Sequence, residues 1–519
     1  MRLLIRADGD ARIGGGHVMR CLALATAAQQ AGHGVTFITA TGPGHMADRI
    51  AQAGCTVIGL PPDSTNPDPA GAPHAPPYAP PHAPPHAHWL IAPWAVDAAL
   101  TARTIAQIQP DWLIWDHYGL DGRWVQAARG DQPLRVMAID DLDDRALGAD
   151  LVLDQTRIAP GPRSNQTLSG LIGPEYALLR PEFATARAAA LLRRGHAVRH
   201  VLVAPGMGDA AGLAPVALAA LADFPGLTID VVMGHSSPTA PAVQDWTRTH
   251  PNVRLILDTS DMAGLMARAD LCIGAGGMSS WERCTLGLPA VLVEVADNQH
   301  DSIRGLVDAG AALGLTLQQA RAGGLGPVIA RAIQDAPAMA TRAAALCDGH
   351  GTARVLCALS GHLRPLRAAD AAMLFDWRNQ PHIRKASLTT TALIWENHLI
   401  WLEQTLKRDD GLWLIYAEQD RPLGYINAIR RAGDLWHWSF YIGAPDAPKR
   451  AGGRMLAAFV HHLLQRSDMA GITAEVRHDN PASCALHRAL GFRQSPAGPG
   501  LLAFRLDRCD VERRLGRAD

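Results

Sequence analysis

No charge of either sign dominates this sequence. It has 48 lysine and arginine residues and 49 aspartate and glutamate residues, so the formal net charge is −1. A chain without a basic or acidic excess gives no electrostatic reason to expect nucleic acid or an anionic membrane as a partner. We therefore expect neither among its partners.

Disulfide frameworks and membrane spans are not indicated either. The eight cysteines are scattered without a CxxC pair, which is typical of a reduced chain without a zinc site. No charge-free apolar run reaches about 18 residues, the length that a membrane helix needs. The opening residues MRLLIRADGD reach a charge too early for the apolar core of a signal peptide. These features predict a cytoplasmic protein with no metal site.

The sequence contains, instead, a long alternation of strand-like and helix-like segments. It runs through residues 1–160 and again through 161–358, which is typical of parallel sheets. We predict an α/β protein with two Rossmann-like lobes, whose ligand lies between them at the carboxyl ends of the strands. Strands with turn signals between them then predict an α+β domain over 362–508, followed by a tail at 509–519.

A proline- and histidine-rich segment interrupts the first lobe at residues 61–88. Proline supplies no N–H to a strand ladder and resists helix, so we expect an exposed loop or polyproline segment. Metal binding by its four histidines is the alternative. These histidines are His74, His82, His86 and His88.

The stretch ADGDARIGGGHVMRCLALA places three glycines before a histidine, between a predicted strand and a predicted helix. Gly14, Gly15 and Gly16 permit a tight turn, and N–H groups at a helix start bind phosphate. His17 would lie in the first helical turn, where the dipole disfavours the imidazolium ion. A neutral imidazole can take a proton from water; a capping or core-edge histidine is the alternative.

A second glycine turn occurs in the second lobe. Gly276 and Gly277 follow a predicted strand, and Ser279 and Ser280 can cap the next helix. Glu282 would lie in the first turn of that helix, where a carboxylate is favourable. A carboxylate beside a glycine loop suits the hydroxyl pair of a ribose. A plain helix-start acid is the alternative.

Six motifs in the two-lobed part carry a resemblance to a known family. The motifs are RADGDARIGGGHVMRCLALA, WDHYGLD, AIDDLDDR, YALLRPEF, GAGGMSSWERCTLGLP and ADNQ. With them, the second lobe is similar to GT-B enzymes that use UDP-sugars. Residues 1–355, apart from the insert, more closely resemble the UDP-2,4-diacetamido-2,4,6-trideoxy-β-L-altropyranose hydrolases of pseudaminic acid biosynthesis. The resemblance implies a GT-B-like fold and inverting hydrolysis of a UDP-sugar without a metal.

The same resemblance implies roles for individual residues. His17 matches the base that activates water, and Glu282 would bind the uridine ribose. The glycine loops would hold the diphosphate, with Ser279 and Ser280 near it. The positions expected at the sugar side of the cleft are Asp116, Tyr118, Asn298 and Gln299. For Asp116, a structural acid at a strand end is the alternative.

Residues 362–508 resemble GNAT-type N-acetyltransferases. The resemblance rests on a basic, glycine-containing turn, APKRAGGRMLAAFV, and on a final motif, EVRHDNPASCALHRALGF. It implies that acetyl-CoA binds at Arg450, Gly452, Gly453 and Asn480. Arg454 stands where the family has a second small residue. His487 stands where a tyrosine commonly protonates the departing thiolate; a helix-surface histidine is the alternative.

The start of this domain, LFDWRNQPHIR, is similar to acetylases of UDP-amino sugars, including the one that modifies the 4-amino group in the same pathway. We therefore predict a bifunctional enzyme. It would acetylate the 4-amino group of the precursor with acetyl-CoA and hydrolyse the resulting UDP-sugar to free sugar and UDP. The alternatives are a GT-B glycosyltransferase fused to an acetyltransferase, and a sugar-nucleotide-binding scaffold.

Overall fold

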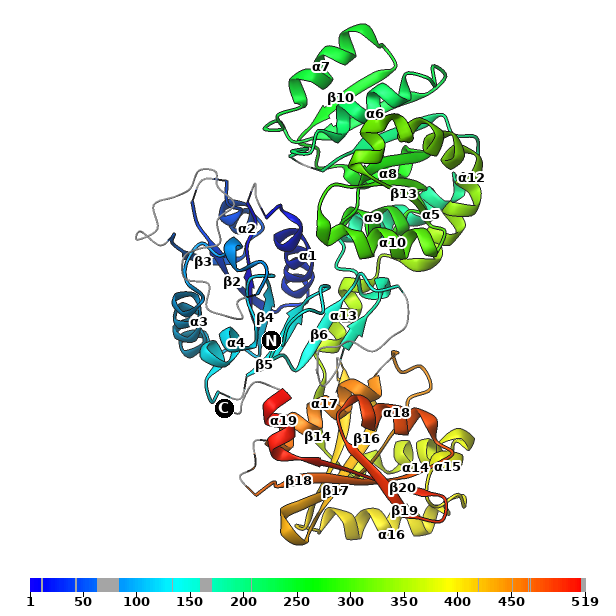
Figure 1. Cartoon of the computed structure of the whole chain (residues 1–519). Coiled ribbons are helices and arrows are strands. Elements are labelled where there is room, and N and C mark those ends of the chain that lie inside the picture. Colours follow the sequence, from blue (N-terminus) through cyan, green and yellow to red (C-terminus); the bar gives the residue numbers. More distant parts are fainter. Residues whose placement is uncertain are drawn as a thin grey trace.

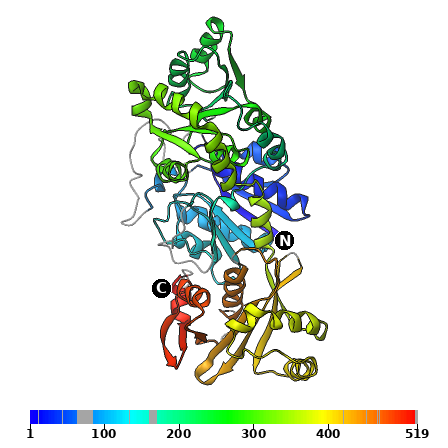
Figure 2. The same ribbon diagram turned by 90° about the vertical axis from the view of Figure 1, so that its right-hand side faces the viewer.

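The chain forms three bodies in a row, each with its own sheet. The second lobe and the third domain lie at opposite ends, with the first lobe between them (Figure 1). Figure 2 shows the same order after a quarter turn. The predicted pair of Rossmann-like lobes followed by an α+β domain is confirmed. The structure, a computed structural model, describes residues 1–10, 13–42, 44–62, 84–132, 134–158, 170–206, 208–418, 420–449, 451–464, 466 and 468–514.

The first lobe is a parallel seven-stranded sheet whose order reverses between β1 and β4. Its strands are, in spatial order, β3 (Thr56–Leu60), β2 (Gly34–Ala40), β1 (Arg2–Ala7), β4 (Trp112–Asp116), β5 (Arg135–Ile139), β6 (Leu151–Asp154) and β7 (Gly170–Ile172). The helices are α1 (Gly16–Gln30), α2 (Ala47–Gln52), α3 (Trp94–Ile108) and α4 (Gly122–Arg129). β4 is buried along its whole length, as expected for a parallel strand covered on both faces.

The second lobe is a parallel six-stranded sheet that reverses in the same way between β8 and β11. Its strands are β10 (Val253–Leu257), β9 (Thr228–Met233), β8 (His200–Ala204), β11 (Leu271–Ala275), β12 (Ala290–Glu294) and β13 (Ala312–Thr316). Its helices are α5 (Pro181–Leu192), α6 (Leu213–Leu221), α7 (Ala240–Thr249), α8 (Met262–Arg268), α9 (Ser279–Thr285), α10 (His300–Asp308), α11 (Leu317–Gln319) and α12 (Leu325–Leu346).

The boundary between the lobes differs from the predicted position at residue 160. β7 lies beyond that position but pairs with β6 in the first sheet. The helix α13 (Gly351–Leu359), which we expected in the second lobe, instead buries Val355 and Leu359 in the core of the first lobe beneath α1. The apolar spacing of a helix shows that one face is buried but not which sheet it covers.

The third domain has a mixed sheet, antiparallel except between β17 and β18. Its strands are β14 (His362–Pro365), β15 (Gly411–Glu418), β16 (Arg421–Arg431), β17 (Leu435–Ile442), β18 (Gly471–Arg477), β20 (Leu501–Asp507) and β19 (Arg493–Gly498). Its helices are α14 (Ala371–Asn379), α15 (Pro381–Ala386), α16 (Trp395–Leu406), α17 (Ala451–Leu464), α18 (Pro481–Ala489) and α19 (Arg508–Arg514). Part of the predicted tail therefore belongs to this domain, because α19 buries Val511 in its core.

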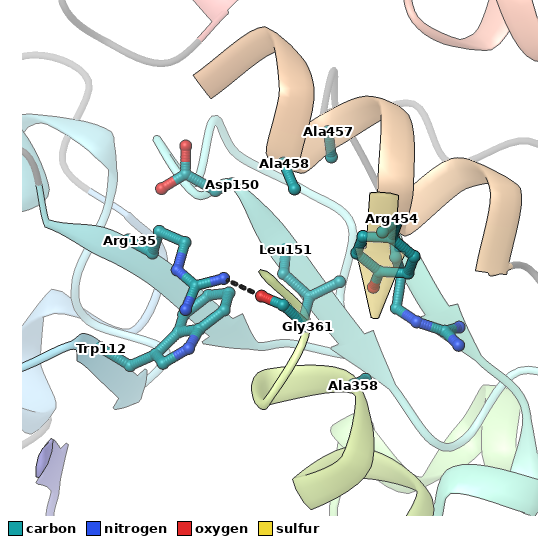
Figure 3. A pocket seen from close by; sticks show the side chains of 10 residues that line it. Trp112, Arg135, Asp150, Leu151, Ala358, Gly361, Arg454, Ala457 and Ala458 are labelled. Atoms are coloured by element: carbon teal, nitrogen blue, oxygen red, sulfur yellow. Dashed lines mark hydrogen bonds between the residues drawn. The ribbon is translucent and has the colours of Figure 1, made fainter. Parts of the chain in front are cut away.

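The third domain docks on the first lobe through a seam seen in Figure 3. On the first-lobe side of the seam, Trp112 Nε1 donates at 2.9 Å to the carbonyl of Leu359, the last residue of α13. The Arg135 guanidinium lies 4.4 Å from the centre of the Trp112 ring and donates to the Gly361 carbonyl at 2.7 Å. A pocket lies along this seam, and Trp112 and Arg135 line it on the first-lobe side. Ala457 and Ala458 of α17 line it on the side of the third domain. The seam joins β4 and β5 of one body to α17 of the other.

A buried ion pair lies next to this seam. Arg454 Nε is 2.6 Å from Glu418 Oε1, and the two residues are 6% and 2% exposed. The Tyr416 hydroxyl donates to the same carboxylate at 2.7 Å, and Cys357 Sγ of α13 lies 3.5 Å from it. Arg454 also donates to the Lys449 carbonyl at 2.9 Å. The guanidinium therefore fixes the turn that precedes α17.

Candidate active sites

His17 and Asp116 meet where the strand order of the first sheet reverses. His17 is the second residue of α1, which follows β1, and Asp116 is the last residue of β4. Because β1 and β4 are parallel neighbours, their carboxyl ends lie side by side. Ligands of open α/β sheets bind at such a reversal point.

The two side chains are in contact. His17 Nδ1 lies 2.5 Å from Asp116 Oδ1. Arg20 donates two hydrogen bonds to the same carboxylate, from Nε to Oδ2 and from Nη2 to Oδ1, each at 2.6 Å. Burial raises the pKa of Asp116, but Arg20 and then His17 outweigh it and hold this pKa well below its ordinary value. With Nδ1 directed at a fixed carboxylate, Nε2 is the nitrogen left to accept a proton.

Asp116 was expected at the sugar side, with a structural acid at a strand end as the alternative. Its side chain is fully buried, and its oxygens accept hydrogen bonds from Arg20 and His17. The carboxylate is thus placed to orient the imidazole, and a sugar contact by Asp116 stays a prediction. Arg20 was not predicted, although its spacing of three residues from His17 puts both on one helix face.

Tyr118 also lies against His17. Its ring meets the imidazole edge-on with centres 4.7 Å apart, and its hydroxyl donates to Asp141 Oδ1 at 2.5 Å. Burial, followed by the Asp141 charge, raises the pKa of Tyr118 well above its ordinary value, so the phenol stays neutral. Two further rings lie on this side of the site. They belong to His86, which the sequence suggested only as one of four alternative metal ligands, and to Trp89, which was not predicted.

The glycine turns of the two lobes lie close to each other. Gly14 has a φ of +82°, a conformation that favours glycine. A Cβ on Gly16 would lie 3.8 Å from Met278 Cγ of the second lobe. Met278 Sδ also lies 4.0 Å from Arg20 Nη1 and 2.6 Å from Gln155 Nε2. The structure thus brings the predicted loops together.

Packing and hydrogen bonds within the second lobe hold its glycine loop, Gly276 and Gly277, in place. A Cβ on Gly276 would lie 2.5 Å from Ile303 Cγ1, so the close packing against α10 requires glycine. The buried Arg283 donates to the Ala275 carbonyl at 2.9 Å and to Ser280 Oγ at 3.0 Å. Ser280 was expected near the diphosphate, but the residue is buried and its hydroxyl accepts hydrogen bonds from Arg283 and from the Gly277 N–H. Ser279 remains partly exposed at the start of α9.

Three other residues of the second lobe were predicted to contact the ligand, namely Glu282, Asn298 and Gln299. Glu282 Oε1 is 3.7 Å from Arg180 Nη2. Burial raises the pKa of Glu282, and Arg180 and Arg283 oppose that rise. Asn298 is exposed, whereas Gln299 Oε1 accepts the Val295 N–H at 3.2 Å and so stabilises its own turn. Ligand contacts by Glu282, Asn298 and Gln299 stay predictions.

The third domain has a fork between its two parallel strands. β17 and β18 pair only from Leu435 to His437 and from Gly471 to Thr473, and then separate. Beyond that point the facing strand edges carry N–H and C=O groups that can pair with the amides of an extended ligand. α17 starts after β17, so its N-terminus lies beyond the open end of the fork. Arg450 lies outside the described residues; Gly452 and Gly453 lie in the first turn of α17.

His487 is not placed to protonate a thiolate. It is 1% exposed and is packed among Trp438, Phe440, Phe492 and Phe504. Its Nδ1 lies 2.8 Å from the Ser483 carbonyl, and its Nε2 accepts from Trp438 Nε1 at 3.1 Å. Burial lowers the pKa of His487. The predicted general acid is therefore a neutral core histidine with both nitrogens engaged.

Asn480 caps α18, because its Oδ1 accepts the Ser483 N–H at 3.1 Å. A contact between Asn480 and CoA stays a prediction beside this structural role. The motif EVRHDNPASCALHRALGF thus contributes a helix cap and core packing.

A histidine that sequence reasoning missed lies at the fork. His437 pairs with Thr473 at the last step before the strands separate, and its Nδ1 lies 3.2 Å from Thr473 Oγ1. It is half-buried, and burial lowers its pKa from the ordinary 6.5, while Glu475 opposes and Arg431 supports that change. A neutral imidazole at this point can accept a proton.

Binding of a metal ion needs a group of metal-ligating side chains, and spanning a membrane needs a long apolar helix. Among the residues that the structure describes, no group of three or more His, Cys, Asp or Glu side chains is arranged to hold a metal ion. His74 and His82 of the proline-rich segment lie outside those residues. No described helix has both the length and the apolar character needed to cross a bilayer.

Two family models match separate parts of the chain. The glycosyltransferase family 28 C-terminal domain matches residues 217–353, and the acetyltransferase (GNAT) domain matches 362–493. With the sheets described above, these matches identify a GT-B-like pair of lobes fused to a GNAT domain.

Among known proteins, the chain is similar to the spore coat polysaccharide biosynthesis protein SpsG of Bacillus subtilis. The two are 29% identical over 240 residues, which cover 44% of this chain and 70% of SpsG. An uncharacterized protein of Methanocaldococcus jannaschii, MJ1062, is 23% identical over 359 residues, 64% of this chain and 70% of that protein.

Solved structures resemble the two parts separately. MurG of Acinetobacter baumannii is 18% identical, covers 68% of this chain and 97% of its own, and has a TM-score of 0.48. The aminoglycoside acetyltransferase AAC(6')-Ib, in complex with coenzyme A and kanamycin, is 17% identical, covers 30% of this chain and 98% of its own, and has a TM-score of 0.27.

Proposed function

We propose that the chain is a bifunctional enzyme of nucleotide-sugar metabolism. The two lobes hydrolyse UDP-2,4-diacetamido-2,4,6-trideoxy-β-L-altropyranose, and the GNAT domain transfers an acetyl group from acetyl-CoA to the 4-amino group of its precursor. The observation that carries the first activity is the His17–Asp116 pair, held by Arg20 and facing the glycine loop of the second lobe.

In the hydrolysis, a water oxygen attacks the anomeric carbon from the side of His17. His17 Nε2 takes a proton from that water, and Asp116 stabilises the imidazolium that forms. The bond between the anomeric carbon and the β-phosphate oxygen breaks, and its electron pair leaves with UDP. Attack opposite the leaving group inverts the configuration. The N–H groups at the starts of α1 and α9 suit the charge on the departing diphosphate.

Glycosyl transfer is the second candidate function, because the second lobe matches a glycosyltransferase family model. A transferase should release little UDP from its donor until an acceptor is added. A hydrolase should release one UDP for each free sugar from the donor alone.

In the acetyl transfer, the amino nitrogen attacks the thioester carbon and CoA leaves as its thiolate. The attacking amine loses a proton, and His437 at the fork accepts it. This assignment follows from the neutrality and half-exposure of His437, two properties that His487 does not combine. The unpaired strand edges of the fork suit the amides of the pantetheine arm, and the start of α17 suits the CoA pyrophosphate.

Replacing His437 with glutamine should lower the turnover number of acetyl transfer by roughly 10²-fold or more. The acidic limb of the wild-type pH profile should lie below pH 6.5, because burial lowers the pKa of His437 from that value. CoA release, followed with a thiol reagent, measures both effects. The exposed His478 provides the control, since glutamine there should change neither. Full activity of H437Q would remove His437 as the base.

Mass spectrometry of the full chain tests both activities together. The chain is incubated with the UDP-4-amino sugar and acetyl-CoA, and the products are followed over time. We expect a mass gain of one acetyl group before UDP appears. UDP release without acetylation, or acetylation without UDP release, would remove one half of the proposal.

A further inference from the structure

The described end of the proline- and histidine-rich segment packs against Tyr118, and Trp89, which follows it directly, lies against His17. The 3₁₀ turn η1 (Ala87–Trp89) places the Trp89 ring 6.2 Å from the His17 ring and 5.6 Å from the Tyr118 ring. The His86 ring packs on both aromatic neighbours, 4.7 Å from Trp89 and 5.5 Å from Tyr118. Three rings from two parts of the chain thus gather on one side of His17.

Backbone contacts hold this segment in place. Within it, the Ala87 N–H donates to the Pro84 carbonyl and the Trp89 N–H donates to the His86 carbonyl, both at 2.9 Å. A Cβ on Gly119 would lie 2.7 Å from the His86 carbonyl oxygen, so the close approach requires the glycine after Tyr118. The insert is therefore anchored to the loop that follows β4.

The cluster is neutral and only partly covered. His86 and Trp89 are both partly exposed, whereas Tyr118 is buried beneath them. Burial, followed by His88, lowers the pKa of His86; Arg145 and His17 act in the same direction and Asp144 against it. Neutral aromatic faces beside a polar catalytic group suit a ligand with apolar C–H surface next to its reacting bond.

We propose that His86, Trp89 and Tyr118 form the sugar-binding wall of the His17 site, with Trp89 setting selectivity for sugars that carry apolar substituents. The ligand is the hexose of a nucleotide-sugar, and this identification rests on the function proposed above. Methyl groups, as in an acetamido group or at C6 of a deoxy sugar, lie against the exposed face of Trp89. The nucleotide lies on the second lobe and does not touch the wall.

Binding measurements test the wall separately from the chemistry. Titration calorimetry on the full chain carrying H17N compares the Kd of the UDP-diacetamido-trideoxy sugar with that of UDP. Adding W89A should weaken sugar-nucleotide binding by roughly 5- to 20-fold and leave UDP binding unchanged. With W89F in place of W89A, the affinity for the sugar nucleotide should return to nearly that of the H17N chain, since phenylalanine keeps a flat apolar face. The matched control is W401A, because Trp401 is an exposed tryptophan on α16 of the third domain and its removal should have no effect.

The outcomes distinguish the two proposals. If W89A weakens UDP and UDP-sugar binding equally, or weakens neither, the wall is overturned. If the H17N chain binds the UDP-sugar no better than UDP, the wall is overturned as well. If W89A behaves as expected but the wild type releases no UDP, the wall stands and the hydrolase does not.

Discussion

With asparagine in place of His17, hydrolysis of the UDP-sugar should slow by roughly 10²–10⁴-fold, the usual contribution of a general base. UDP should bind as it does to the wild type, because the amide is close in size to the imidazole and we propose that backbone N–H groups make the diphosphate contacts. Stopped assays of UDP release measure the first quantity and calorimetry the second. Turnover near the wild-type rate in H17N would remove His17 as the base.

Asp116 allows a sharper version of the same experiment. Replacing it with asparagine removes the charge that steadies the imidazolium and frees the ring to adopt the other tautomer. The turnover number should therefore fall while KM changes little. H235Q is the matched control, since His235 also contacts an aspartate but is 76% exposed on the second lobe. A rise in KM without loss of turnover would instead favour a sugar contact for Asp116.

The largest loss of stability should follow from breaking the pair between Glu418 and Arg454. Alanine at position 418 leaves a buried guanidinium without its partner, which costs about 3–5 kcal/mol. Calorimetric unfolding of the full chain should show the transition of the third domain at lower temperature. Affinity for acetyl-CoA should fall as well, because Arg454 fixes the turn before α17.

Two further variants test whether the loss of stability in E418A comes from the unpaired guanidinium of Arg454. The double variant E418L/R454M removes both charges and should recover most of the lost stability, since a well-packed apolar pair can replace a buried ion pair. E403A removes the acid of an exposed helical pair with Lys407 and should leave the transition where it is. A single variant E418A as stable as the wild type would show that the pair contributes little.

The sequence predicted the architecture well because parallel sheets leave a strong local signal. Buried strands such as β4 read as continuous apolar runs, and the glycines after β1 and β11 mark turns that approach ligands. The fate of α13 could not be predicted in this way. Its apolar face fits either sheet, and only the packed structure places Val355 and Leu359 beneath α1.

Individual site residues were harder to predict than loops, because a motif does not give the direction of a side chain. His487 lies in a family motif, yet four aromatic side chains surround it and bury its ring. His437 lies in no motif, and only the pairing of β17 with β18 reveals its position. Trp89 was hidden by composition, since the proline-rich residues before it favour an exposed loop.

The return of α13 to the first lobe has a mechanical consequence. The chain enters the second lobe after β7 and leaves it before α13, so the second lobe is an insertion held by two crossings. The third domain begins after α13 and is anchored on the first lobe by the hydrogen bond from Arg135 to the Gly361 carbonyl. The first lobe therefore contacts both other bodies, the second lobe through two chain crossings and the third domain through the seam. A rotation of the second lobe relative to the first would change the distance between Met278 and Gly16 while leaving the contact between Arg135 and Gly361 unchanged.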